Sequence, residues 1–376
     1  MAVSSDLGPG ASRGAPFARA GLVAGALVLI AAVALLAGGR YGLLLAIGLG
    51  FGMVLEGFRF GFAGPWRALI TRREAGGTLA QLLSIALVAV VAFPILSGAG
   101  GSVVGAHAPV GWAMVGGAFV FGAAMQVVMG CGSGTLVNAG SGNPVSLMAL
   151  PFFALGSFAG ATHLFWWTGL GTLPVVALEG GAGLAVTLAM LAAAAGIVWA
   201  VARPGGRAIP RRLWIAAVLL AALALANLAV AGQPWGVVYG LGLWAAKGAV
   251  ALGGELSGSA FWAAEANQDR LAQSLLTDVT SLTNIGIIVG AFLIAAWRGG
   301  LRAGLPSLPP RAWVATVIAG FLLGYSSRLA FGCNVGAFFS GISTGSLHGW
   351  AWFVAAFAGA FLGVRLRPVL GLEARS

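Results

Sequence analysis

Charged side chains are so scarce in this chain that they limit its fold more than any motif does. Of 376 residues, 20 are lysine or arginine and 9 are aspartate or glutamate, so 8% are charged, while 59% are hydrophobic. A soluble domain has about 25% charged residues, and a disordered chain combines low hydrophobicity with high charge, so both classes are excluded. A transmembrane β-barrel would alternate apolar and polar residues in short segments, whereas the apolar runs here are long and continuous. The sequence predicts an all-α, polytopic integral membrane protein.

Apolar segments of about the length that a bilayer requires follow one another along the chain. Residues 1–19 are small and polar, and we expect them to form a disordered cytoplasmic tail. The first apolar segment, 20–39, is long for a signal peptide and further spans follow at once, so we expect a retained helix. We predict about nine to eleven apolar helices, since some segments are short enough to be half-helices. The segments are 20–39, 41–56, 78–98, 112–129, 145–168, 183–202, 213–231, 235–253, 280–297, 312–331 and 346–366.

The arginines predict the orientation of the chain. The net charge is +11, and nineteen of the 20 basic residues are arginine. Most flank apolar segments, which is the positive-inside pattern of membrane topology and not a nucleic-acid-binding surface. Three basic stretches, Arg59 to Arg73, Arg203 to Arg212 and Arg298 to Arg311, should therefore be cytoplasmic. However, counting three predicted spans between the second and third stretches would place the third basic stretch on the outer side of the membrane. Either one span does not cross, or residues 254–276 hide a further crossing or re-entrant piece.

An internal repeat includes both cysteines of the chain. Residues 118–136, AFVFGAAMQVVMGCGSGTL, match residues 320–338, GFLLGYSSRLAFGCNVGAF, and Cys131 aligns with Cys333 at an offset of 202 positions (333 − 131). Repeats with glycine-broken helices are typical of many transporter folds, whose substrate site lies where the repeats meet. Non-helical backbone at that depth must be buried or line a cavity. Free N–H groups at half-helix N-termini could bind an anion there.

These stretches resemble the YeeE/YedE family of bacterial sulfur-transport membrane proteins. The most specific segment is RLAFGCNVGAFFSGISTGSLHGWAWFVAAFAGAFLG (328–363), and MGCGSGTLVNAGSGNP (129–144), PWGVVYGLGLWAAK (234–247) and TSLTNIGIIVGAFL (280–293) are similar to further family segments. The resemblance covers roughly 40–366. It implies an inner-membrane protein with two inverted halves and re-entrant helical pieces, which would account for the conflict in span counting. It also implies uptake of thiosulfate or a related sulfur compound along a narrow central path. For some members it implies a small TusA-like sulfur carrier protein as partner.

On that resemblance, Cys131 and Cys333 carry over as substrate-contacting residues. Without it, each could equally be an inert buried cysteine, since a free thiol packs as a small hydrophobe. A disulfide between them would need Cα atoms within about 7 Å. Many relatives have a third cysteine in an early segment similar to R-F-C-F, but here GFRFGFAG (57–64) has Gly61 at that position. A full three-cysteine relay is therefore in doubt, and a different sulfur species or a selenium compound is an alternative substrate.

Polar residues beside the two cysteines are further candidates. Arg328 lies inside a span and aligns with Gln126. It would attract an anion or pair with a carboxylate, or it would snorkel at a helix end. Asn334 adjoins Cys333 and is the strongest candidate among the neutral side chains. The remaining candidates are Asn138, Ser340 and the loop glycines Gly130, Gly132 and Gly332. The polar side chains could equally satisfy loop backbone or cap the next helix.

Other ionisable residues have simpler interpretations. Glu56 and Lys247 end spans in corresponding halves and are interpreted as interface anchors, although they could pair with each other or guard a mouth of the path. The histidines, His107, His163 and His348, lack metal-ligand spacing, and no GxxxxGK[ST] phosphate loop occurs. We therefore expect no metal site, no cofactor and no nucleic-acid partner.

The sequence as a whole predicts a permease and not an enzyme. We expect membrane halves at 20–202 and 203–366, a short tail at 367–376, and a location in the bacterial inner membrane. The substrate would be a small sulfur-containing anion, most simply thiosulfate, and lipid would surround the chain. The alternative is a membrane thiol–disulfide oxidoreductase in which the two cysteines cycle between dithiol and disulfide, although neither lies in a CxxC motif. A structural subunit of a larger complex is a third interpretation.

Overall fold

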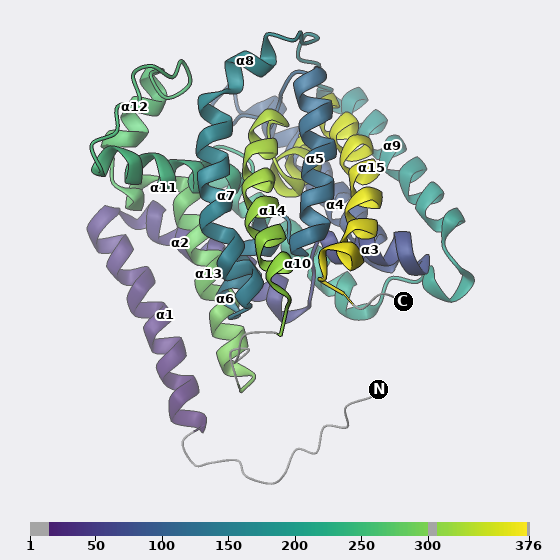
Figure 1. Cartoon of the computed structure of the whole chain (residues 1–376), viewed down its shortest axis with the longest axis horizontal. Coiled ribbons are helices and arrows are strands. Elements are labelled where there is room, and N and C mark those ends of the chain that lie inside the picture. Colours follow the sequence, from purple (N-terminus) through teal and green to yellow (C-terminus); the bar gives the residue numbers. More distant parts are fainter. Residues whose placement is uncertain (1–14, 300–306, 374–376) are drawn as a thin grey trace.

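The computed structural model describes residues 15–299 and 307–373, and it is a bundle of helices (Figure 1). Ten helical stretches in this part of the chain are long and apolar enough to cross a membrane, which confirms the predicted all-α polytopic fold. The elements are α1 (Ala15–Ala37), α2 (Gly39–Gly57), α3 (Ala63–Arg72), α4 (Gly76–Gly98), α5 (Trp112–Val128), α6 (Gly132–Gly140), α7 (Pro144–Thr162), α8 (Leu164–Thr168), α9 (Gly180–Val201), η1 (Pro204–Gly206), α10 (Arg211–Ala231), α11 (Val238–Ala251), α12 (Glu265–Ala272), η2 (Leu275–Thr277), α13 (Val279–Trp297), α14 (Pro310–Leu329), η3 (Asn334–Gly341) and α15 (Leu347–Leu370).

The two expected tails overlap the first and last helices. Helix α1 begins at Ala15, inside the expected tail 1–19, and residues 1–14 of that tail lie outside the described residues. Helix α15 continues to Leu370, four residues beyond the expected end of the membrane half at 366. Residues 374–376 also lie outside the described part.

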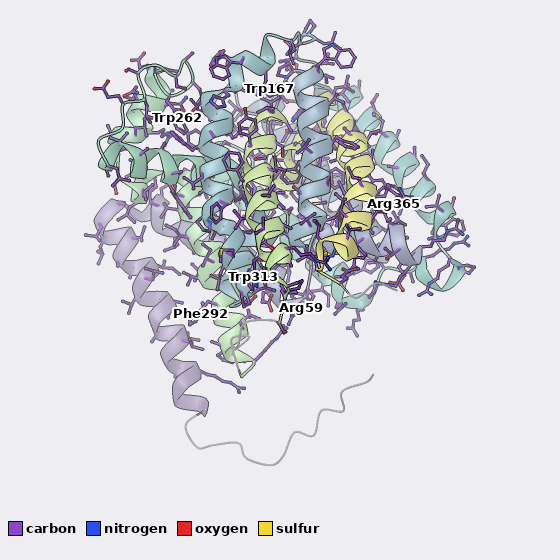
Figure 2. The ribbon with its side chains drawn as sticks, in the orientation of Figure 1. Arg59, Trp167, Trp262, Phe292, Trp313 and Arg365 are labelled. Atoms are coloured by element: carbon purple, nitrogen blue, oxygen red, sulfur yellow. The ribbon has the colours of Figure 1, made fainter. Side chains whose placement is uncertain are left out.

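The described parts of the three basic stretches lie on one face of the bundle, which we call the basic face. Glu74, after α3, forms an ion pair with Arg203, after α9. Arg298, after α13, donates hydrogen bonds to the backbone carbonyls of Glu56 and Gly57 at the end of α2. Figure 2 shows Arg59 toward this end of the molecule. The positive-inside rule predicts that the basic face is the cytoplasmic one.

Helix α11 resolves the conflict in the count of spans. Its 14 residues extend about 21 Å at 1.5 Å per residue, which is less than the roughly 30 Å of bilayer hydrocarbon. Lys247 on α11 donates to the carbonyls of Leu271 and Gln273, which fastens the following loop and the exposed α12 on the face opposite the basic one. Among the described helices between Arg212 and Arg298, α10 and α13 are the ones long enough to cross a membrane. The structure therefore favours the first alternative, in which segment 235–253 does not cross.

The repeated stretches form two trios of helices, α5–α6–α7 and α14–η3–α15, that run in opposite directions. Residues Gly111 and Ser346, just before α5 and α15, both form bridges to the loop between α8 and α9, so these two helices start on the face opposite the basic one. Pro309, just before α14, packs against Gly371 at the far end of α15. Helix α14 therefore starts on the basic face, antiparallel to its equivalent α5, and the repeat is inverted.

Glycine seams hold the trios together. Helix α5 packs on α15, and α14 packs on α7, so the first helix of each trio pairs with the last helix of the other. The repeat-equivalent Gly122 and Gly324 sit in these two seams, where a Cβ atom would collide with the backbone of Ala356 and of Phe153. Helices α2 and α13 form a third seam, in which a Cβ on Gly48 would lie 2.7 Å from the carbonyl oxygen of Thr283. Small residues permit such close approach between membrane helices, where packing is the main attraction.

Candidate functional site

Two equivalent breaks in the helices place the cysteines at the centre of the molecule. Met129 and Phe331, which are 202 positions apart, both adopt left-handed backbone angles, with φ of 56° and 53°. The next residue in each case closes a wide turn: Gly130 N–H donates to the Met125 carbonyl at 3.2 Å, and Gly332 N–H donates to the Ser327 carbonyl at 2.8 Å. The backbone is thus broken in the same way in both halves, and a cysteine follows each break.

The two cysteines are fully buried and each precedes a short helical segment. Cys131 is the N-cap of α6, where its Sγ accepts a hydrogen bond from Gly134 N–H at 3.5 Å and lies 3.4 Å from the Ser133 hydroxyl. Cys333 precedes the π-helical segment η3, and its side chain makes no such cap bond. Both thiols are free in this structure.

An inner cavity of about 150 Å³ opens toward the basic face and ends at Cys131. The end of α2, the loop from α2 to α3, and the turn between α5 and α6 form its walls. Glu56 and Arg59 lie in this lining and form an ion pair at 3.3 Å, so the cavity has both charges at its mouth. Gly61 also lines this cavity, and a Cβ atom there would meet nothing within 4 Å.

An outer cavity of about 450 Å³ opens on the other face and ends at Cys333. The loop before α5, the loop from α10 to α11, and the turn between α14 and η3 line it. Its polar lining includes Arg328, Tyr239 and His107, and among the described residues no carboxylate lines it. The positively charged guanidinium therefore dominates the electrostatics of this cavity.

The cavities approach each other at the contact between Gly132 and Cys333. A Cβ atom on Gly132 would lie 2.9 Å from the Cys333 Sγ and 3.3 Å from a methyl group of Val237. Glycine is required at this point because the backbone of one repeat lies directly against the thiol of the other. Cys131 lines the inner cavity and Cys333 lines the outer one, so both thiols lie where the two cavities approach each other.

Arg328 has the features of an anion-binding residue. Its guanidinium carbon lies 4.8 Å from the centre of the Phe261 ring and 5.7 Å from the centre of the Tyr239 ring. None of the carboxylates in the described residues pairs with it, and its buried Nε has no hydrogen-bond partner. Of the roles that the sequence allowed, the geometry favours attraction of an anion over pairing with a carboxylate, and Arg328 lines the outer cavity. A cation held by aromatic faces inside a membrane protein is a costly arrangement that is usually functional.

The neutral candidates separate into different environments. Asn334 is fully buried, and neither its Nδ2 nor its Oδ1 has a hydrogen-bond partner. Asn138 lines the inner cavity, where its amide donates weakly to the Met129 carbonyl at 3.4 Å. Ser340 lines neither cavity, because its hydroxyl donates to the carbonyl of Trp235 at 2.7 Å and so ties η3 to the loop before α11. Gly130 lines the inner cavity, and Gly332 lines the outer one.

Several residues that the sequence did not favour lie at the cavities. Glu56 faces the inner cavity, whereas Lys247 binds backbone carbonyls beyond the outer end of α11, so these two cannot pair with each other. His107 lines the outer cavity and its Nε2 lies 2.8 Å from the Thr344 carbonyl. Tyr239 and Phe261 reach the same cavity from α11 and the loop after it. No spacing in the sequence signals these residues, because tertiary packing alone brings them together.

Comparisons with known proteins agree with this architecture. A family model described as Sulphur transport matches residues 58–362. The chain is 36% identical over 107 residues to the "Probable transporter YedE" of Escherichia coli (strain K12), a match that covers 28% of this chain and 26% of that protein. A protein of the same name from Salmonella typhimurium is 36% identical over 102 residues, and 25% of it is covered. The matched segment thus spans about a quarter of the length of these two relatives.

A longer match joins the chain to a third protein. The "Thiosulfate transporter TsuA" of Spirochaeta thermophila is 29% identical over 257 residues, which is 62% of this chain and 71% of that protein.

Proposed function

Because this chain belongs to the Sulphur transport family, we propose that it is a permease that carries thiosulfate, or a closely related small sulfur-containing anion, across the bacterial inner membrane. The observation that carries the proposal is the pair of cavities, one from each face, that end at two fully buried thiols. A protein named as a thiosulfate transporter among its relatives supports the choice of substrate.

The anion enters through the outer cavity, where Arg328 attracts it. No carboxylate in the lining opposes the guanidinium. Charge-assisted hydrogen bonds from arginine to an anionic oxygen are about twice as strong as neutral ones, and they are stronger still away from bulk water. The outer cavity thus concentrates the substrate next to Cys333.

The thiols then carry the anion through the constriction. An S–H group is a weak donor and its sulfur is polarizable, so it holds a sulfur-containing anion without trapping it, as conduction requires. The free N–H groups at the start of α6 favour negative charge beside Cys131. Asn334, whose amide has no partner inside the protein, supplies a donor for a substrate oxygen.

The basic face delivers the substrate to the cell interior. Exposed arginines in two of its loops, including Arg72, Arg73, Arg211 and Arg212, provide a docking surface for a small TusA-like sulfur carrier protein of complementary charge. This partner belongs to the proposal, and a change in uptake on adding such a carrier to the inner compartment of vesicles would support it.

Uptake of radiolabelled thiosulfate into proteoliposomes tests the proposal. We expect uptake by the wild type and its loss in both Cys131→Ala and Cys333→Ala, with partial activity in the corresponding serine variants, which retain a hydrogen-bond donor. Thr187→Ala is the matched control, because Thr187 is buried on α9 and lines neither cavity. Full uptake by the double alanine variant would refute the role of the thiols.

The same assay separates the alternative functions. A well-folded wild type that ignores thiosulfate but takes up a selenium-containing anion would change the substrate and keep the path, and Gly61 in place of a third cysteine makes this the first substitute to try. A thiol–disulfide oxidoreductase would lose both thiols in equal amounts after mild oxidation and recover them on reduction. A permease would show no such cycle linked to its uptake.

A further inference from the structure

A wholly apolar groove of about 520 Å³ lies between α1, α2 and α13, apart from the transport path. Every residue that lines it is apolar, including Leu22 and Ala26 on α1, Leu49 on α2 and Ile294 on α13. These three helices are among the ten membrane-spanning stretches. The groove therefore faces the hydrocarbon of the bilayer and not water.

The groove, which we call the wedge, is closed at the end away from the basic face. There α1 packs tightly on α2, where a Cβ on Gly42 would lie 2.7 Å from the Ala34 Cβ. Helix α1 lies at the outer edge of the bundle (Figure 1), and Leu27 and Met53 on the walls of the wedge are 61% and 38% exposed. Only 6% of the membrane-spanning window of α1 is buried, so other protein elements leave the wedge open.

At the end of the wedge near the basic face, the cation that contacts the lining in the described part of the chain is Arg19. The Arg19 guanidinium lies 5.1 Å from the centre of the Trp297 ring and donates to the Trp297 carbonyl. Trp297 itself lines the groove and is 43% exposed. A tryptophan with an adjacent arginine at a helix end marks the level of the lipid headgroups, and anionic headgroups on the cytoplasmic leaflet attract such a cation.

We propose that this groove is a binding site for one anionic phospholipid of the cytoplasmic leaflet, with an acyl chain in the wedge and the phosphate at Arg19. The occupant is a lipid because the walls are apolar over their whole length, the opening faces hydrocarbon, and the charged side chain at the mouth among the described residues, Arg19, is positive. The bound lipid fastens α1 to α2 and α13. Without the lipid, α1 contacts these helices mainly near the face opposite the basic one.

Native mass spectrometry of the detergent-purified full chain tests the site. We expect one phosphatidylglycerol to remain bound, with about fivefold weaker retention of phosphatidylcholine, which corresponds to one arginine near an anionic headgroup. Ala26→Trp fills the wedge and should lose the bound lipid. Ala24→Trp is the matched control, because Ala24 is exposed on the same helix and does not line the groove.

A second variant tests recognition of the lipid headgroup separately from binding of the acyl chain. Arg19 is exposed, so Arg19→Gln should fold normally, retain a lipid and bind phosphatidylglycerol and phosphatidylcholine equally. Equal lipid retention by Ala26→Trp and Ala24→Trp would overturn the proposal. So would a wild-type dimer that Ala26→Trp dissociates, because a second copy of the chain would then occupy the groove. An undiminished preference for phosphatidylglycerol in Arg19→Gln would remove the role of Arg19.

Discussion

The outer and inner cavities are equivalent by the internal repeat, yet they differ in charge. Arg328 lies at the outer cavity without a carboxylate partner. At the equivalent position of the other half, Gln126 is fully buried and its Nε2 donates to the Ala63 carbonyl at 3.1 Å. The inner cavity instead has Glu56 paired with Arg59. One cavity therefore has an unpaired positive charge, and the other has a balanced pair.

The difference separates what the fold preserves from what each half has changed. The backbone break, with its left-handed residue and its buried cysteine, is the same in both halves. The side chains around the break differ between the halves, as at Gly132 and its repeat-equivalent Asn334. A common frame holds the two thiols, and in the proposed permease the neighbouring side chains would give each side its own affinity for an anion. Such a difference would suit capture on the outer side and release on the inner side.

The largest effect should come from closing the constriction where the cavities meet. Gly132→Ala adds a methyl group 2.9 Å from the Cys333 Sγ, and overpacking at such a tight contact forces the neighbours apart. We expect the initial rate of anion uptake to fall about 100-fold, the size of effect that a 1 Å misplacement can produce. Gly134→Ala is the control, since its Cβ would make only an ordinary 3.6 Å contact with the Cys131 Sγ. Equal rates in the two variants would disprove the constriction.

The next effect should come from removing the charge that distinguishes the outer cavity. Arg328→Gln gives the outer half the residue that the inner half has at position 126. Because a charge-assisted hydrogen bond contributes about 1.5–3 kcal/mol, we expect the KM for uptake to rise roughly 10- to 100-fold with a smaller change in the maximal rate. Arg328→Lys should recover part of the loss. An unchanged KM in Arg328→Gln would show that the two cavities do not differ in anion affinity.

A smaller effect, of opposite sign, should follow from uncovering the arginine. Phe261→Leu removes a ring whose centre lies 4.8 Å from the Arg328 guanidinium carbon. A cation–π contact contributes about 0.5–1 kcal/mol, so the freed guanidinium should lower the KM by roughly two- to fivefold. The concentration dependence of uptake measures this change, and Phe321→Leu, on the exposed side of α14, is the control. A higher KM in Phe261→Leu would mean that the ring helps to bind the substrate.

The smallest effect should come from adding a thiol to the inner cavity. Gly61→Cys points into open space, so we expect the melting temperature to change by no more than about 2 °C, as for a surface substitution. The new thiol should react with a membrane-impermeant maleimide applied to the basic face and not from the other side. Labelling from the opposite face alone would reverse the assignment of the inner cavity.

The sequence predicted the frame of the molecule better than the details of its site. Composition predicted the polytopic helical fold, and the alignment of Cys131 with Cys333 predicted the paired breaks. Segment 235–253 looked like any other span, because apolar composition does not reveal that α11 is too short to cross. Asn334 and Ser340 both looked like polar loop residues, but only packing decides that the Ser340 hydroxyl is bound to the Trp235 carbonyl while the Asn334 amide has no partner.

The glycine at position 61 shows the limit of reasoning from a motif. A missing cysteine indicated a gap in a relay, but the structure places Gly61 at the wall of the inner cavity, with its carbonyl accepting a hydrogen bond from Gln81 at 2.7 Å. The hydrogen bond from Gln81 holds the backbone of this loop without any side chain at position 61. At this position the backbone itself forms the wall of the inner cavity.

The inverted pairing of the trios has an evolutionary consequence. A single trio encoded alone could have formed an equivalent seam only with a copy of itself inserted in the opposite orientation in the same membrane. Each position would then have faced one compartment in one copy and the other compartment in the second copy. A chain that contains both copies is free of that constraint. One copy can have an arginine at position 328 while the other has a glutamine at position 126, so the fused repeat permits a difference between the two faces that a symmetric pair does not.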